Sequence, residues 1–246
     1  MTGSTHSQIS LPDARFAGAH WSIILRETGN SADARDSLFE LVRRYDYPVY
    51  AYVRRCGHTP EVSRAVTQKF LQHLLGEFHR DNALRPAPHY REFLLERLHG
   101  FLAADWRDEV AAQSAVIPTT TQDMEARYLR DHTKPNSPDD VFQRSFALEV
   151  LHRSLASLRE EAKQTGHENM YSALEPFLSR EPGAGVYEQL AASLHSRPLV
   201  LVMALKRLRQ RLRELTGKEL ADTVGGADDL TAEQDILLSV LRERGR

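Results

Sequence analysis

Apolar residues recur every three or four positions through most of the chain, and no run alternates apolar with polar residues as a half-buried strand does. Thr59 precedes Pro60, which is the pattern of an N-cap followed by proline at the first helical position. We therefore expect an all-α fold. The predicted helices cover about 31–56, with a bend near Pro48, and then 60–78, 90–115, 140–163 and 168–178.

The first three predicted helices each carry an apolar stripe that we expect to face a core. On the third helix this spacing includes Tyr90, Phe93, Phe101 and Trp106. We therefore expect these rings either in the core or, if exposed, at a binding surface. The predicted inward residues are Leu38, Leu41, Val42, Tyr45, Val49, Tyr52 and Val53, then Val62, Val66, Phe70, Leu74 and Leu75, then Tyr90, Phe93, Leu94, Leu98, Phe101, Leu102 and Trp106.

The helical pattern lapses between about 116 and 138, where threonine, proline, asparagine and charged residues predominate. Such composition is typical of an exposed connection and places a domain boundary there. Thr231 with Gln234 matches a capping box, which predicts a last amphipathic helix from Thr231 to about Glu243 after a hinge. The expected division is a disordered segment at 1–20, helical domains at 21–115 and 140–224 joined by a linker at 116–139, and a hinge and helix at 225–246.

The segment from Val186 to Arg213 reads as a short helix, a tight turn and a longer helix. Five of the eight residues from Lys206 to Arg213 are Lys or Arg. A helix-turn-helix unit has this form, because its second helix enters the major groove while basic side chains meet phosphates. An amphipathic helix with a solvated charged face explains the segment about as well.

Composition narrows the possible functions. Across 246 residues the formal net charge is −2, so binding to nucleic acid would have to come from local basic patches. A single cysteine, Cys56, excludes an internal disulfide. No long apolar window marks a membrane span or a secretory leader, so we expect a cytoplasmic protein without membrane insertion.

Motifs of common enzymes are missing from the sequence. It contains no phosphate-binding Gly-x-x-x-x-Gly-Lys-Ser/Thr loop, no Gly-x-Ser-x-Gly elbow and no His-Glu-x-x-His pair. The eleven histidines are scattered, without metal-ligand spacing. We expect no catalytic residues, no metal site and no cofactor.

Several short motifs follow one another in a specific order. They are Ala34-Arg35, Tyr45, Pro48-Val-Tyr-Ala-Tyr-Val-Arg-Arg55, Gly57, Val66-Thr-Gln-Lys-Phe70, Leu74-Leu75, Tyr90-Arg-Glu-Phe-Leu-Leu95, Phe101-Leu102, Tyr187-Glu-Gln-Leu-Ala191, Arg207-Leu-Arg209 and Thr223-Val224. In this order and spacing they resemble the bacterial extracytoplasmic-function sigma factors, especially the group with longer chains. The resemblance spans about 21–224.

The resemblance implies two helical domains with separate tasks. The first would bind core RNA polymerase and the minus-10 element of promoter DNA, and the second would bind the minus-35 element through its helix-turn-helix. The polymerase-binding residues it implies are Arg64, Thr67, Gln68 and Phe70. The DNA-binding residues it implies are Arg91, Arg97, Trp106 and Arg107 in the first domain and Ser196, Arg197, Lys206, Arg207, Arg209 and Arg213 in the second.

One departure from the family lies at Val62-Ser-Arg-Ala65, where the family carries an acidic run. A phosphoryl group on Ser63, Thr67 or Thr59 would restore negative charge, since it adds roughly −1.5 to −2 charges. A subgroup of the family that lacks the same run is regulated by a kinase, so a Ser/Thr kinase or an anti-sigma factor is a candidate partner. Simple sequence drift explains the departure equally well.

A second departure concerns the reading of DNA. The residues from Pro198 to Leu205 are apolar except for backbone groups, although base-reading positions need hydrogen-bonding side chains. The main expectation is a sigma factor for transcription initiation. Its alternative is a sigma-like regulatory protein with weakened DNA binding that acts through protein contacts. An unrelated helical enzyme or adaptor is a third and weaker interpretation.

Overall fold

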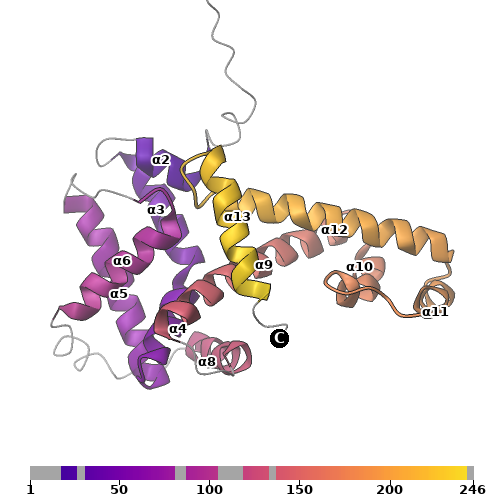
Figure 1. Ribbon diagram of the computed structural model, residues 1–246, viewed down its shortest axis with the longest axis horizontal. Coiled ribbons are helices and arrows are strands. Elements are labelled where there is room, and N and C mark those ends of the chain that lie inside the picture. The colour runs from indigo at the N-terminus through magenta and orange to yellow at the C-terminus, as the bar shows by residue number, and fades with distance from the viewer. Residues whose placement is uncertain (1–17, 27–30, 81–86, 105–118, 133–136, 243–246) are drawn as a thin grey trace, which may run out of the picture. The chain divides into compact units, whose positions relative to one another are not determined.

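The structure is a computed structural model that describes residues 18–26, 31–80, 87–104, 119–132 and 137–242 (Figure 1). Over these ranges the chain forms eleven α-helices and one 3-10 helix, and none of the described residues belongs to a strand. A single antiparallel bridge within these ranges pairs His89 with Val224. The predicted all-α class is confirmed.

The chain divides into two compact units, which we call unit 1 and unit 2. Unit 1 comprises residues 1–149 and 220–246, and unit 2 comprises residues 150–219. These limits differ from the two helical domains expected at 21–115 and 140–224, whose assignment stays a prediction.

The helices keep the labels of Figure 1. Unit 1 contains α2 (His20–Arg26), α3 (Ala32–Arg44), α4 (Asp46–Arg55), α5 (Pro60–Arg80), α6 (Tyr90–Ala103), α8 (Thr119–Asp131) and α13 (Ala227–Arg242). Unit 2 contains α10 (Glu168–Leu174), the 3-10 helix η1 (Glu175–Phe177) and α11 (Val186–Ser193), while α9 (Pro138–Gln164) and α12 (Pro198–Ala221) contribute residues to both units.

The helix predicted at 31–56 is in fact two helices, α3 and α4, which meet at Tyr45 rather than at Pro48. Tyr45 has φ −119° and ψ 34°, outside the helical region, and its ring stacks on Phe146 at a centroid distance of 4.5 Å. Pro48 lies in the first turn of α4, where a backbone N–H has no helical acceptor to lose. The chain therefore turns where a buried aromatic ring can pack.

The core of unit 1 is rich in aromatic rings. Trp21 is fully buried between Tyr90 and Phe93, and its indole Nε1 donates to the Ala87 carbonyl oxygen at 3.0 Å. All seven residues predicted to face inward between Leu38 and Val53 are buried. On α6 the prediction is also confirmed for Tyr90, Phe93, Leu94 and Leu98, whereas Phe101 and Leu102 are half-buried and Trp106 lies outside the described residues.

The expectation of an exposed connection at 116–139 is wrong for residues 119–131, which form α8. Tyr128 of this helix is buried against Tyr47, Tyr50 and Val141. Glu125 accepts hydrogen bonds from Arg54 Nε and Nη2, both at 2.8 Å, and from the Tyr50 hydroxyl at 2.6 Å. The threonine-rich start made this segment look like a loop. Tyr128 and Glu125 attach the helix to α4.

The segment after α12 is joined to Trp21 and to the segment before α6 by backbone hydrogen bonds. Trp21 N–H donates to Asp222 O at 3.0 Å, Tyr90 N–H to Thr223 O at 2.9 Å, and Gly225 N–H to Pro88 O at 3.1 Å. A Cβ on Gly225 would lie only 2.7 Å from Leu25 Cδ1, so a larger residue here would have to displace the end of that side chain.

The last helix begins at Ala227, not at the predicted cap Thr231, so the expected hinge is only partly present. Asp228 and Asp229 lie in the first turn of α13, where their negative charges favour a helix N-terminus. The sequence pattern had placed these aspartates in the hinge. The residues before them, Gly225 and Gly226, make the turn into the helix.

A buried carboxylate connects α13 to α6. Glu233 is 0% exposed, and its oxygens accept from Arg91 Nε at 2.7 Å and from Arg91 Nη2 at 2.9 Å. His89 Nδ1 lies 2.9 Å from the same carboxylate, and Arg91 Nη1 donates to Gln143 Oε1 at 2.5 Å. We call these four side chains the Glu233 network. Apart from this network, α13 buries few groups, chiefly Leu237.

Replacing Glu233 with alanine should lower the free energy of unfolding by about 3 kcal/mol, because Arg91 would be left buried without its counter-charge. The matched control is Asp235→Ala, an exposed carboxylate on the same helix, which should change stability by less than about 0.5 kcal/mol. Urea unfolding followed by circular dichroism measures both values. Equal effects of the two substitutions would contradict the assigned role of the Glu233 network.

Unfolding should also depend on pH through Glu125, whose pKa is held below its ordinary value of 4.5 by hydrogen bonds from Arg54 and Tyr50. A carboxyl with a depressed folded pKa stabilises the fold above the unfolded value and loses this contribution as the pH falls through the folded value. Glu125→Gln should therefore destabilise the protein clearly at pH 7 and much less at pH 3. Urea unfolding at both pH values measures the difference, and a constant difference would contradict it.

Candidate nucleic-acid interface

The predicted short helix, turn and longer helix are present in unit 2 as α11 and α12. Ser196 N–H donates to Ala191 O at 2.9 Å and closes the turn, in which His195 adopts a left-handed conformation with φ 49°. Pro198 is the first residue of α12, where its ring favours helix initiation. The two helices thus have the connection that a helix-turn-helix unit requires.

Apolar contacts orient α12 within unit 2. Leu201 and Leu205 are buried against Leu174 of α10 and Ala191 of α11. Farther along α12, Leu215 is buried with Leu158, Ala162 and Tyr171. Since one side of α12 faces this core, the residues about half a turn away are directed to solvent.

Four of the predicted DNA-binding cations lie on the solvent side of this helix pair. Arg197, Lys206, Arg207 and Arg213 are exposed, and Ser196 in the turn is half-buried. Arg213 Nη1 donates to Gln210 Oε1 at 2.9 Å. Arg197, Lys206 and Arg207 make no side-chain hydrogen bond or ion pair with any residue that the structure describes. Their charges are therefore uncompensated and available to an anion.

Arg209 is placed differently from the prediction. Its guanidinium forms an ion pair with Glu181 at 2.5 Å and donates to Phe177 O at 2.8 Å and Arg180 O at 2.6 Å. These bonds direct the guanidinium back onto the loop after η1, so in this structure Arg209 stabilises unit 2 and is not presented to DNA. The periodicity of the basic cluster did not reveal this because the acceptors are mostly backbone carbonyls.

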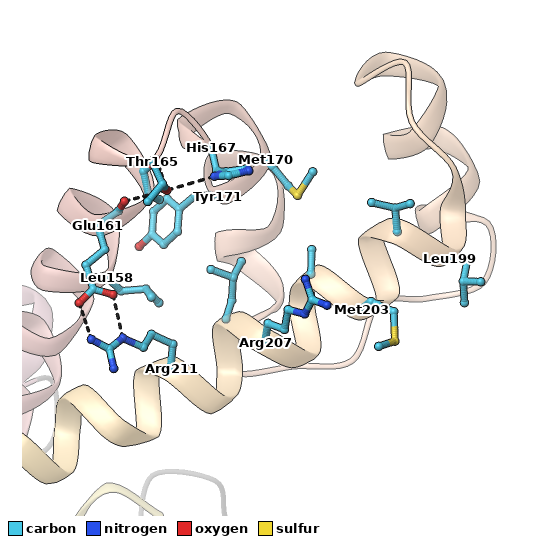
Figure 2. Close-up of a pocket in the computed structure, with 14 residues that line it drawn as sticks. Leu158, Glu161, Thr165, His167, Met170, Tyr171, Leu199, Met203, Arg207 and Arg211 are labelled. Atoms are coloured by element: carbon cyan, nitrogen blue, oxygen red, sulfur yellow. Dashed lines mark hydrogen bonds and ion pairs between the residues drawn. The ribbon is translucent and has the colours of Figure 1, made fainter.

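The first two turns of α12 present apolar side chains to solvent. Leu199 is 71% exposed, Val202 39% and Met203 46%. Beside them lies a cavity of about 630 Å³, bounded by α9 and α10 on one side and by α12 on the other (Figure 2). Arg211, at one end of the cavity, binds Glu161 through two hydrogen bonds of 2.7 and 2.8 Å, which lower the pKa of that carboxyl.

Most of the predicted polymerase-binding residues on α5 are not on the surface. Thr67 is 0% exposed and Phe70 1%, and Phe70 packs against Phe101 at a centroid distance of 5.5 Å. Arg64 is partly buried and binds Asp46 at 3.3 Å. Of the four, Gln68 alone is exposed. The Val-Thr-Gln-x-Phe motif therefore contributes chiefly to the core of unit 1, and a partner reaching α5 would meet residues such as Gln68 and Gln72.

The residues predicted to contact the minus-10 element differ in their surroundings. Arg91 is 4% exposed and its guanidinium belongs to the Glu233 network, so in this conformation it cannot contact DNA. Arg97 lies over the Phe93 ring at 5.5 Å. Trp106 and Arg107 lie outside the described residues. The sequence pattern did not reveal Glu233 because this residue is more than 140 positions away from Arg91 in the chain.

The three predicted phosphorylation sites differ in exposure. Ser63 and Thr67 are each 0% exposed, and Thr67 Oγ1 donates to Ser63 O inside α5. Thr59 is exposed, and its Oγ1 accepts from Val62 N–H at 3.4 Å, in agreement with the predicted N-cap. Of the three, Thr59 alone is open to a modifying enzyme in this structure.

Two further properties of the described residues bear on possible chemistry. Among them, no three His, Cys, Asp or Glu side chains are grouped so that they could hold a metal ion. No helix in the same part of the chain combines the length and apolar character needed to cross a membrane.

Comparison of the chain with models of protein families, with curated proteins and with solved structures finds no match. Support for a function therefore comes from the geometry described above and from the motif resemblance in the sequence.

Acidic substitutions at the three predicted phosphorylation sites should separate by burial. Ser63→Glu and Thr67→Glu should each destabilise the protein by about 3 kcal/mol, because each places an unpaired charge in the core. Thr59→Asp should change stability by less than about 0.5 kcal/mol, since aspartate is also a good N-cap. Urea unfolding measures all three, and an equally stable Thr67→Glu variant would show that α5 is not held as described.

Proposed function

We propose that the protein is a sigma-type transcription factor that binds core RNA polymerase and directs it to promoter DNA. The observation that carries this proposal is the α11–turn–α12 unit, which presents uncompensated Arg197, Lys206 and Arg207 on its solvent side. The ordered motifs that resemble extracytoplasmic-function sigma factors support it. In this proposal the chain performs no catalysis and needs no cofactor.

Contacts of unit 2 with DNA would be largely electrostatic. Each cation that neutralises a phosphate releases counterions, which makes affinity strongly dependent on salt. Because the whole chain carries a net charge of −2, this attraction would be confined to the solvent side of α11 and α12 and would orient unit 2 on the duplex. Arg213 would add a contact about two turns beyond Lys206.

Unit 1 would bind the polymerase and the minus-10 element. Of the residues implied for the polymerase contact, Gln68 is accessible as the protein stands. For Arg91 to contact DNA, α13 would have to leave α6, because the Arg91 guanidinium is hydrogen-bonded to Glu233. This structure thus corresponds to a form in which the predicted minus-10 helix is partly covered by α13.

Regulation by phosphorylation, which we retain as part of the proposal, would act at Thr59. A phosphoryl group there would lie at the N-terminus of α5, where helix dipoles favour negative charge. It would also supply the acidic character missing from Val62–Ala65. A Ser/Thr kinase and an anti-sigma factor remain proposed partners in the cytoplasm.

A second candidate function is a sigma-like regulator that acts through protein contacts with weakened DNA binding. Exposed Leu199, Val202 and Met203 favour it, because these side chains occupy the part of α12 that would face base edges and cannot form hydrogen bonds with them. Within unit 2 these side chains are not covered by other described residues, so this part of α12 can meet a partner.

The decisive experiment is transcription in vitro with purified bacterial core RNA polymerase on a library of genomic fragments, with the unaltered chain and with Thr59→Asp. We expect discrete transcripts that depend on the chain, and more of them with Thr59→Asp. Binding of promoter DNA is measured separately at several salt concentrations. Lys206→Ala and Arg207→Ala should each reduce the slope of log affinity for DNA against log salt concentration by about 1, because each removes one phosphate contact.

Lys163→Ala, an exposed cation of α9, is the matched control and should leave the salt slope unchanged. Absence of both co-elution with core polymerase and chain-dependent transcripts would overturn the sigma proposal. The sigma-like regulator would be favoured if the chain bound polymerase without producing any transcript and if the Lys206 and Arg207 variants had an unaltered salt slope.

A further inference from the structure

Exposed apolar side chains are concentrated at the start of α12. Of the eight large hydrophobic residues that are exposed in the described part of the chain, four lie between Leu199 and Met203. The other four, on α3, α8 and α13, are not clustered in this way. Isolated exposed apolar residues are ordinary on protein surfaces, but contiguous ones mark interaction sites.

This apolar stretch continues into the cavity between α9, α10 and α12. The cavity lining is mostly apolar and includes Leu158, Met170, Tyr171, Val200 and Leu208 (Figure 2). It also includes Leu199 and Met203. Together they form one surface of unit 2, which we call the α12 face.

The α12 face is bordered by cations without an ion-pair partner. Among the described residues that line the cavity, Glu161 is the single carboxylate, and it accepts two hydrogen bonds from Arg211, which also pairs with Glu214. Arg207 borders the cavity without an ion pair to any described residue, and the same holds for Lys206 and Arg197 nearby. A ligand of this surface should therefore be apolar at its centre and acidic at its edges.

The dimensions of the α12 face suit a helix. From Leu199 to Arg211 the surface extends along thirteen residues of α12, whose twelve helical steps correspond to about 18 Å, or a little more than three helical turns. Three turns of an amphipathic helix place apolar anchors at positions i, i+3, i+4 and i+7 on one side. No sheet edge exists among the described residues to which an extended peptide could add.

We propose that the α12 face binds an amphipathic, acidic helix of a partner protein, whose apolar side covers Leu199, Met203 and the cavity and whose carboxylates pair with Lys206 and Arg207. This inference rests on the second candidate function, because it assigns the apolar start of α12 to a protein contact. Duplex DNA would satisfy the cations but would leave the apolar side chains against base edges with which they form no hydrogen bonds.

The test is selection from a displayed library of helical peptides about 16 residues long, with fixed leucines at i, i+3, i+4 and i+7 and acidic, basic or neutral residues allowed elsewhere. The full chain is the target. We expect the enriched peptides to be predominantly acidic. Their dissociation constants, measured by fluorescence anisotropy, should rise at least about tenfold with Met203→Asp and with Arg207→Glu, and affinity should fall with added salt.

Two controls keep the outcome unambiguous. Leu129→Asp changes an exposed apolar residue of unit 1, and Lys163→Glu changes an exposed cation of unit 2 that does not line the cavity. Both should leave peptide binding unchanged. All four substitutions are at exposed positions, and thermal unfolding verifies that each variant is folded.

Three results would overturn the proposal: no enrichment of acidic peptides, equal binding by the Met203→Asp variant, or enrichment of peptides insensitive to Arg207→Glu. Duplex DNA is tested separately on the same variants. If Met203→Asp weakens DNA binding as much as peptide binding, the α12 face is a DNA-contacting surface and the peptide proposal fails while the sigma proposal survives. Peptide binding without DNA binding would support the peptide proposal and count against promoter recognition by unit 2.

Discussion

The arrangement of unit 1 depends on one buried ionic contact, the Glu233 network. A carboxylate that is 0% exposed would be strongly destabilising alone, and Arg91 and His89 together supply its hydrogen bonds. Besides Leu237, α13 packs Leu230 against Ala19, Ala221 and Val224, so apolar contacts act together with the Glu233 network in placing this helix. A buried ion pair adds modest net stability, but removing one partner leaves an uncompensated buried charge, so Glu233 and Arg91 are needed together.

The sequence predicted the all-helical class and most inward-facing residues, because apolar periodicity reports directly on burial. It predicted less well where local composition and tertiary contacts disagree. Tyr45 interrupts a helical pattern because its ring fits against Phe146, whereas α8 forms in a polar stretch because Glu125 and Tyr128 attach it to α4. Such events depend on partners far away in the chain, and no window of neighbouring residues contains them.

The same reason explains the mixed result for the candidate site. Periodicity indicates which positions of α12 face solvent. The structure agrees for Lys206, Arg207 and Arg213, which are exposed. Periodicity could not identify Arg209 as a ligand of backbone carbonyls, nor Arg91 as the partner of Glu233. A motif shared with a family identifies residue types, but burial decides which of them, such as Gln68 rather than Thr67, can meet a partner.

The backbone hydrogen bonds between residues 222–225 and residues 21, 88 and 90 have a consequence for synthesis of the chain. Unit 2 is formed by one continuous stretch, 150–219, which can fold once it has left the ribosome, whereas unit 1 needs residues from both ends of the sequence. Contacts between distant segments form slowly, and the buried site around Trp21 and Tyr90 stays incomplete until Thr223 and Val224 emerge. During translation the aromatic residues around Trp21 therefore remain without these backbone partners until the second part of unit 1 has been made.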